Sequence, residues 1–140
     1  MEKKFFAIGA FFAGLAVATG SYGAHGLQKL VPIERIHTWE KAVRYQMYHA
    51  FALIFVAWAI TQWWDQANTL KAAGWSFIAG IVLFSGSVYI RVFTGDLQTE
   101  GFATFLDPAY ITPAGGILMI IGWYLLMRAA LKAEETGLRP

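Results

Sequence analysis

The chain has 140 residues, of which 57% are hydrophobic and only 14% are charged, against about 25% charged residues in soluble proteins. A domain of this size cannot bury so much apolar surface within itself, so we predict one domain, residues 1–140, that has the lipid bilayer as its solvent. The net charge of +2 comes from scattered residues, which argues against a nucleic-acid partner, and the absence of cysteine excludes disulfides and thiolate chemistry.

Four stretches without a formal charge are long enough to cross a bilayer. They cover residues 5–28, 45–64, 72–90 and 108–127, which are 24, 20, 19 and 20 residues long. A helix needs about 20 residues to cross the hydrocarbon core. We therefore predict an all-α integral membrane protein, a bundle of four transmembrane helices at about residues 3–21, 33–64, 70–93 and 113–135.

The first predicted helix, 3–21, carries small residues at a spacing of four. Gly9 and Gly14 belong to this pattern, which lets helices approach closely in lipid, so we predict that both pack against other helices. The same segment also resembles a signal peptide, whose cleavage would leave three spans. The glycine-rich stretch 20–26 that follows predicts a sharp turn or a close approach of the backbone.

The second predicted helix, 33–64, begins where Pro32 and Glu34 favour a helix N-terminus. At 1.5 Å per residue it would be about 48 Å long, which exceeds the ~30 Å hydrocarbon core. Its first three turns are therefore predicted to lie in the interface, or to break away, as an amphipathic extension. Arg44 would then lie at the level of the lipid headgroups and His49 deeper in the membrane, more than one helical turn further along.

The third and fourth predicted helices also contain small residues that favour packing, among them Gly80, Gly86, Gly115 and Gly116. Gly95 is predicted to cap the third helix, and Thr112-Pro113 to provide the N-cap and first residue of the fourth. The connection between these helices, residues 96–111, is the longest, and we expect its apolar side chains to dip into the interface.

Four spans would place both termini and the 65–70 turn on one side of the membrane. That side carries six Lys and Arg residues and the other carries five, a slight preference for cytoplasmic termini in a bacterial inner membrane. The other side collects His25, Glu40, Arg44 and Arg91. The full set of candidates for ligand binding is His25, Glu40, Arg44, Tyr45, Gln46, His49, Ser87 and Arg91.

Structural roles are the alternative for these residues. Arg91 is predicted to pair with Glu40 or Asp96 and so to clamp the two connections on that side. A histidine inside a membrane, such as His49, more often makes one hydrogen bond to a neighbouring helix and stays neutral, and Gln46, Tyr45 and Ser87 are the expected partners. His25, in the glycine-rich stretch, is interpreted as a hydrogen-bonding or exposed residue.

No pattern typical of an enzyme or a metal site is found. The four uncharged runs contain no carboxylate, which argues against a proton-coupled exporter. The histidines lie 12 residues apart, unlike zinc ligands on a helix, and no nucleophile elbow or phosphate-binding loop is present. We predict no cofactor, no metal and no catalytic residue.

Several blocks of the sequence together resemble a known family. They are GSYGAHGL (20–27), WEKAVRYQMYHA (39–50), LFSGSVY (83–89), ITPAGG (111–116) and GW at 122–123. In this order they resemble the small membrane proteins grouped as domain of unknown function 423, the YgdD-like proteins. The resemblance implies a four-helix membrane protein of a bacterial inner membrane or an organelle, and it supplies no catalytic residue.

Two functional hypotheses follow. The first is a non-enzymatic packing module that forms a homo-oligomer or joins other membrane protein subunits in a larger complex. The second is a binder or conduit for a small molecule or lipid, with its site around Arg44, His49 and Arg91. An intramembrane enzyme is the weakest hypothesis because no nucleophile–base pair is visible.

Overall fold

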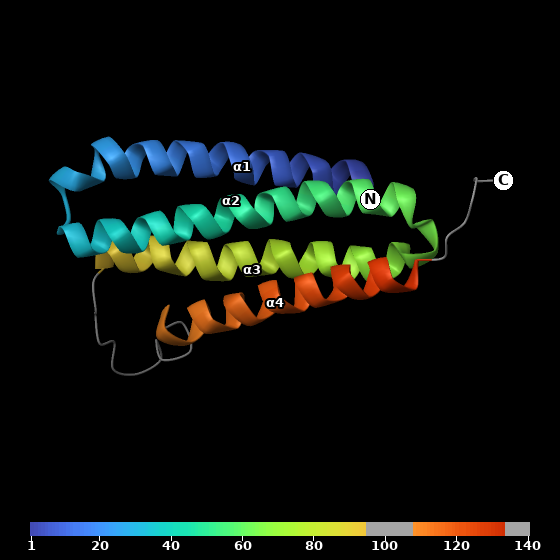
Figure 1. Ribbon diagram of the computed structural model, residues 1–140. Coiled ribbons are helices and arrows are strands. Elements are labelled where there is room, and N and C mark those ends of the chain that lie inside the picture. The colour runs from blue at the N-terminus through green and yellow to red at the C-terminus, as the bar shows by residue number, and fades with distance from the viewer. Residues whose placement is uncertain (95–107, 134–140) are drawn as a thin grey trace.

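The computed structural model describes residues 1–94 and 108–133, and all of the regular elements in those ranges are helical (Figure 1). The four long helices are α1 (Glu2–His25), α2 (Ile33–Gln62), α3 (Ala67–Thr94) and α4 (Pro108–Lys132). Two short 3₁₀ helices, η1 (Leu27–Lys29) and η2 (Trp64–Gln66), lie in the connections on either side of α2.

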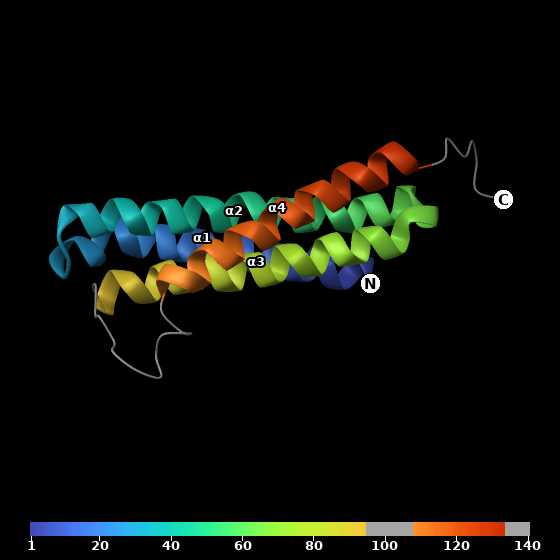
Figure 2. The ribbon, with the colours of Figure 1, turned by 90° about the horizontal axis from the view of Figure 1, so that it is seen from below.

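The long helices run alternately up and down, and each packs mainly on its neighbour in the sequence. α2 lies between α1 and α3, and α4 packs on α3 (Figure 1). The view from below shows that α4 crosses α3 obliquely (Figure 2). The start of α1 and the end of α4 lie at the same end of the molecule, together with η2 (Figure 1).

The interior contains two apolar clusters. The larger joins all four long helices and includes Phe5, Leu53, Phe77 and Met119. The smaller joins Leu27, Trp39 and Val92 at the end where α1 turns into α2. Many large apolar side chains are exposed as well, such as Leu131 at 78%, which fits a protein whose solvent is lipid.

Three helical stretches are long and apolar enough to cross a membrane. They are Glu2–Lys29, Trp64–Thr94 and Tyr110–Lys132. α2 is the least apolar of the four long helices and is not among them. Length and composition therefore support three of the four predicted spans, and the span in α2 stays a prediction.

The first helix is longer than predicted. α1 continues through the glycine-rich stretch to His25, and the chain turns only at 26–32. The expectation of a sharp turn within 20–26 was therefore wrong, and the alternative of a close approach applies. A Cβ atom on Gly23 would lie 2.7 Å from Cδ1 of Trp39, so a larger residue would displace that indole ring.

The start of the second helix does not separate from the rest. α2 is continuous over 30 residues, about 45 Å at 1.5 Å per residue, and Ile36 and Trp39 in its first two turns are buried. A segment that breaks away from the bundle is thus not observed, because these side chains pack against the neighbouring helices. Its placement in the interface stays a prediction.

The fourth helix begins five residues before the predicted start. Pro108, not Pro113, is its first residue, a position where the missing N–H of proline costs nothing. Pro113 lies inside the helix, which membrane helices tolerate. The predicted cap at Gly95, the predicted interfacial side chains of 96–107 and the helix end near residue 135 lie outside the described residues.

Candidate functional site

A chain of hydrogen bonds links three helices through the interior. Gln46 of α2 is 2% exposed, and its Nε2 donates to the carbonyl oxygen of Phe12 in α1 at 2.9 Å. Its Oε1 accepts a hydrogen bond from the Tyr89 hydroxyl of α3, also at 2.9 Å. The Tyr89 hydroxyl in turn lies 3.3 Å from Oγ1 of Thr19 in α1. Both ends of the Gln46 amide are thus used to join helices.

The same chain continues toward the α1–α2 turn. Nε1 of Trp39 donates to the carbonyl oxygen of Thr19 at 2.8 Å, and the indole packs against Tyr89 with ring centroids 4.4 Å apart. In the described part of the chain, no buried side-chain nitrogen or oxygen lacks a hydrogen-bond partner. The polar groups inside the bundle therefore meet the requirement that apolar surroundings impose.

His49 lies in the middle of α2 and is 5% exposed. Its Nδ1 donates to the carbonyl oxygen of Tyr45, one turn earlier, at 2.6 Å. Its Nε2 accepts from Nε1 of Trp123 in α4 at 3.2 Å. Because an indole N–H can only donate, Nε2 carries no proton, and the bonds assign the neutral Nδ1–H tautomer.

The partner of His49 on a neighbouring helix is therefore Trp123. The side chains of Gln46, Tyr45 and Ser87, expected from the sequence, are not its hydrogen-bond partners. The ring of Tyr45 stacks on the imidazole with centroids 6.1 Å apart, and Phe77 of α3 lies at 5.7 Å. A ligand or a proton could reach Nε2 only by displacing the indole of Trp123.

Serine side chains join the later helices. Oγ of Ser87 donates to the carbonyl oxygen of Phe84 at 3.0 Å and lies 2.7 Å from Oγ1 of Thr112 in α4. Oγ of Ser85 donates to the carbonyl oxygen of Ala42 in α2 at 3.0 Å. Ser87, predicted as a ligand contact, is thus part of the α3–α4 contact.

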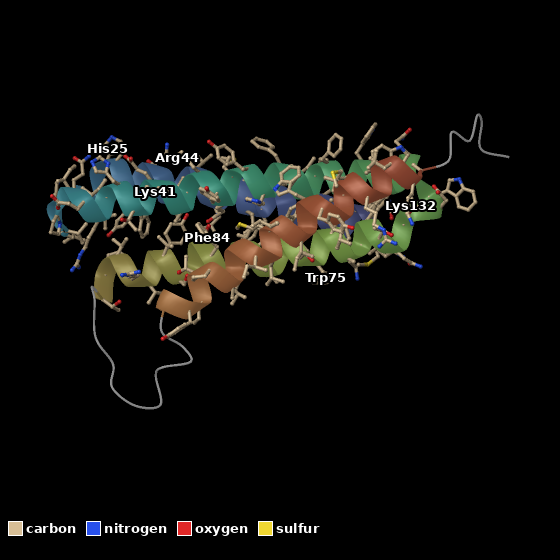
Figure 3. The ribbon with its side chains drawn as sticks, turned by 60° about the horizontal axis from the view of Figure 1, so that its bottom comes forward. His25, Lys41, Arg44, Trp75, Phe84 and Lys132 are labelled. Atoms are coloured by element: carbon tan, nitrogen blue, oxygen red, sulfur yellow. The ribbon has the colours of Figure 1, made fainter. Side chains whose placement is uncertain are left out.

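The predicted charged residues occupy separate places. His25 is exposed, with Nδ1 3.0 Å from the carbonyl oxygen of Ser21, and Arg44 is exposed further along the same end of the molecule (Figure 3). The Glu40 carboxylate lies 3.7 Å from Nδ1 of His37. Arg44 borders a hollow of about 270 Å³ between α1 and α2, whereas Arg91 lines a different cleft. The structure does not gather Arg44, His49 and Arg91 into one pocket.

The cleft that contains Arg91 has a volume of about 370 Å³ and lies between the N-terminal end of α2, the C-terminal end of α3 and the start of α4. Nη1 of Arg35, which also lines it, donates to the carbonyl oxygen of Val92 in the last turn of α3 at 3.2 Å. The remaining lining residues are Glu34, Thr38, Val88, Val92 and Thr112.

Sequence reasoning did not select Arg35, although a signal was available. A cation in the first turn of a helix opposes the helix dipole, so a position such as Arg35 needs another reason for its charge. Among the described residues, no group of three His, Asp or Glu side chains comes together as metal ligands would.

The six glycines predicted to pack fall into two groups. A Cβ atom on Gly9 would lie 2.8 Å from the Ala50 carbonyl oxygen, and one on Gly80 would lie 2.7 Å from Cγ of Met119. Gly115 faces the backbone of Phe84 just as closely. These three lie at contacts between helices, α1 with α2 and α3 with α4.

The other three predicted glycines have more space. Nothing lies within 4 Å of a Cβ atom on Gly14 or Gly86, and one on Gly116 would make only an ordinary contact of 3.8 Å. Two close contacts were not foreseen, at Gly74 against Phe5 and at Gly122 against Phe77. Spacing alone cannot tell which side of a helix a neighbour covers.

The comparisons with known proteins place the chain in a family. Residues 19–116 match the family model described as protein of unknown function DUF423. The chain belongs to this family. A UPF0382 membrane protein of Staphylococcus aureus is 43% identical over 130 residues, covering 93% of this chain and 97% of that protein. The UPF0382 membrane protein YwdK of Bacillus subtilis is 40% identical over 93% of this chain and 98% of its own length. No solved structure matches the chain.

These relatives are named as membrane proteins, and none of those names states an enzymatic activity. Together with the apolar helices they establish that this chain is a membrane protein of the same family.

Proposed function

We propose that the chain is a non-enzymatic membrane protein whose four long helices all span the bilayer and which associates with further copies of itself through the outer face of α1. α2 packs between α1 and α3, which are both apolar enough to cross, and this position supports a place for α2 inside the membrane beside them (Figure 1). Gln46 and His49, which lower its hydropathy, are hydrogen-bonded inside the bundle and do not face lipid.

The observation that carries the proposed association is a second small-residue face on α1. Gly9, Ala16 and Gly23 recur every seven residues and are buried. A separate set at helical spacing is exposed: Ala7, Ala10, Gly14, Ala18 and Ser21. α1 thus carries one small-residue face inside the chain and another that is open to the surroundings.

Small residues on a lipid-facing surface favour close helix contact for a physical reason. Lipid chains are as apolar as side chains, so helices associate in a membrane mainly through van der Waals contact at short range. Gly14 has no side chain, and nothing in the chain lies within 4 Å of where its Cβ atom would be, so the backbone of a partner helix could approach closely there. A second copy of α1 offers the same surface and gives a two-fold symmetric contact.

Cysteine crosslinking in native membranes tests the association. The chain contains no cysteine, so Gly14→Cys introduces a single thiol. If α1 faces α1 of a second copy, mild oxidation should give a covalent dimer in high yield. Ile120→Cys, an exposed position (69%) near the middle of α4, is the matched control for random collisions.

Equal yields at the two positions would refute association through α1. Gly14→Leu should also reduce the oligomer seen by native mass spectrometry while leaving the fold intact, because nothing lies within 4 Å of that position. Co-purification with a different membrane protein, and no dimer, would instead assign the chain as an accessory subunit of a larger complex.

A second function, binding or conduction of a small molecule or lipid, is favoured by one observation. The cleft of about 370 Å³ with Arg35 and Arg91 places two cations at the end of the bundle opposite the N-terminus. The sequence-based version of this function, centred on Arg44, His49 and Arg91, has less support because those residues lie apart.

The proposed setting is a bacterial inner membrane with cytoplasmic termini. It is supported by the bacterial relatives and by the small excess of cations on the side of the termini. A single cysteine added at the N-terminus of the otherwise cysteine-free chain tests the orientation. The measurement compares how readily its thiol is labelled in intact cells and in inverted vesicles.

A further inference from the structure

An apolar groove of about 330 Å³ lies between α2 and α4 on the outer surface of the bundle. Its lining is aromatic and aliphatic, from Tyr48, Phe51, Ala52 and Phe55 of α2 and from Trp123 and Leu126 of α4. The four aromatic residues are each 47–59% exposed, so the groove is open to the surroundings of the bundle. Around the middle of helices that cross a membrane, those surroundings are the acyl chains of lipids.

The wall of the groove that α4 provides is fixed from behind. The indole of Trp123 donates a hydrogen bond to Nε2 of His49, and its ring centroid lies 5.2 Å from that of Phe77. These two contacts hold the ring in place while part of it lines the groove. A wall that is already in place loses little conformational freedom when a ligand covers it.

Two cations continue the same face of α2 toward its N-terminal end. Lys41 and Arg44 precede Tyr48 by seven and four residues, and side chains at these spacings share one face of a helix. At 1.5 Å per residue, Arg44 lies about 6 Å and Lys41 about 10 Å before Tyr48 along the helix axis. Both side chains are exposed, near the end of the bundle where α1 turns into α2 (Figure 3).

The charges of these two cations are not used within the chain. Across residues 1–94 and 108–133, neither Lys41 nor Arg44 forms an ion pair or a hydrogen bond through its side chain. Glu40, one turn before Arg44, lies instead 3.7 Å from Nδ1 of His37. An anion that reaches this face therefore has no bond within the chain to displace.

Arg44 points away from α3. The carbonyl oxygen of Ala42 and the side chain of Gln46 both accept hydrogen bonds from α3. Residues two apart on a helix are separated by about 200°, and Arg44 is two residues from each, so it lies on the opposite side of α2. It therefore faces away from the helix whose end borders the undescribed residues 95–107.

Positive charge above an open apolar groove matches one class of ligand. An anionic phospholipid carries a phosphate at headgroup level and acyl chains that extend into the hydrocarbon. Guanidinium and ammonium groups both bind phosphate oxygens, and an acyl chain is apolar like the groove. A second copy of the chain is a poorer match, because a two-fold contact through this face would bring the same cations of both copies to one depth.

We propose that an anionic phospholipid binds to this surface, with its phosphate on Arg44 and Lys41 and one acyl chain in the groove between α2 and α4. The site shares Arg44 with the sequence-based hypothesis, but it uses neither His49 nor Arg91 as a ligand contact. It goes beyond the proposed association and does not depend on it, because the association uses the outer face of α1.

Lipid retention by the full chain tests the two cations. The chain is reconstituted in phosphatidylcholine with a minor fraction of phosphatidylglycerol, and its bound lipids are counted by native mass spectrometry after gentle extraction. The unaltered chain should retain phosphatidylglycerol above its share in the vesicles. Arg44→Gln should weaken this retention about ten-fold, as expected for the loss of hydrogen bonds to a charged group, and Lys41→Gln should weaken it as well.

Lys29→Gln is the matched control. It removes one positive charge from an exposed position at the same end of the bundle, in η1 and so not on this face of α2. Equal losses in Lys29→Gln, Lys41→Gln and Arg44→Gln would overturn the proposal, since they would indicate only a general attraction to anionic lipid. No enrichment of phosphatidylglycerol on the unaltered chain would overturn it as well.

Phe55→Ala tests the groove, because it removes part of one wall and leaves both cations in place. It should lower the retention of phosphatidylglycerol several-fold, whereas Phe11→Ala, which removes an exposed phenyl ring from α1, should not. Each substituted side chain is exposed, so circular dichroism should show an unchanged helical fold. Equal retention in the two variants would show that no acyl chain occupies the groove.

A soluble competitor separates a lipid from a free anion. Glycerol 3-phosphate carries the phosphate without acyl chains, so it should compete poorly with phosphatidylglycerol. If it displaces the lipid as readily as added phosphatidylglycerol does, the site takes a soluble anion and the lipid assignment is wrong.

Discussion

The adjacent glycines Gly115 and Gly116 of α4 allow a direct test of the packing of α4 on α3. A Cβ atom on Gly115 would lie 2.9 Å from both Cα and Cβ of Phe84 and still closer to its amide nitrogen, whereas one on Gly116 would lie 3.8 Å from the nearest atom. The obstacle at Gly115 is backbone inside a helix, so it cannot rotate away. Gly115→Ala therefore has to push α4 away from α3.

The two alanine substitutions are expected to affect the free energy of unfolding differently. Replacing a helical glycine by alanine stabilises by about 0.5–1 kcal/mol where space allows, which is the case for Gly116→Ala. Overpacking of a tight contact costs about 1–3 kcal/mol, which exceeds that gain at Gly115. Gly115→Ala should lower the free energy of unfolding by roughly 1–2 kcal/mol, and Gly116→Ala should leave it equal or slightly raised.

The assay is reversible unfolding of the purified chain in mixed micelles, followed by circular dichroism. Both variants carry the same chemical change at neighbouring positions, so differences in expression or detergent binding largely cancel. Equal stability of the two variants, or a lower stability of Gly116→Ala, would show that α4 does not pack on α3 as described.

Two hydrogen-bond pairs should behave as coupled units in the same assay. Gln46→Leu and Tyr89→Phe should each destabilise the fold, and a double-mutant cycle should give a coupling of about 0.6–1.7 kcal/mol, as found for hydrogen bonds between membrane helices; additive effects would refute the bond. Trp123→Phe removes the N–H that donates to His49 and also part of the ring contact with Phe77, so its cost should be about 1 kcal/mol larger with His49 present than in a His49→Leu background. Tyr124→Phe, which removes a polar hydrogen from an exposed aromatic neighbour, should have no effect. An equal loss from Trp123→Phe in both backgrounds would contradict this pairing.

The number and approximate place of the long helices could be predicted from the sequence because charge marks their ends. Lys71 and Arg91 bound an uncharged run, and α3 extends only a few residues beyond them in each direction. A formal charge is costly in hydrocarbon, so its absence over about 20 residues is a strong signal.

The ends of the helices were harder to predict because local signals compete. Glycine favours a turn, yet residues 20–25 remain helical. There the absence of a side chain at Gly23 lets Trp39 pack against the α1 backbone, and this tertiary contact outweighs the local preference. At α4 two prolines could each have opened the helix, and only the arrangement in space selects Pro108.

The sequence indicated which residues of the site are polar and need partners, but not which residues lie together. Gln46 and His49 are polar residues inside an apolar run, and such residues need partners in the bundle. The sequence does not show which partner lies opposite, because Tyr89 and Trp123 are 43 and 74 residues away. The partner of Arg35 was hidden for the same reason, since Val92 is brought to it only by the packing of α3 on α2.

The division of polar groups between the interior and the ends relates the fold to the two proposals. The amide of Gln46 and the imidazole of His49 are each bonded on both sides, so the middle of the bundle offers no free group to a ligand at these positions. Binding chemistry is therefore expected toward the end of the bundle, where the side chains of Lys41 and Arg44 are exposed and can donate to an anion. Association, in contrast, needs no polar group, and the open face of α1 at Gly14 suits it because close packing is what holds helices together in lipid. The two proposals thus assign different surfaces to different tasks, and variants of one surface should leave the other task intact.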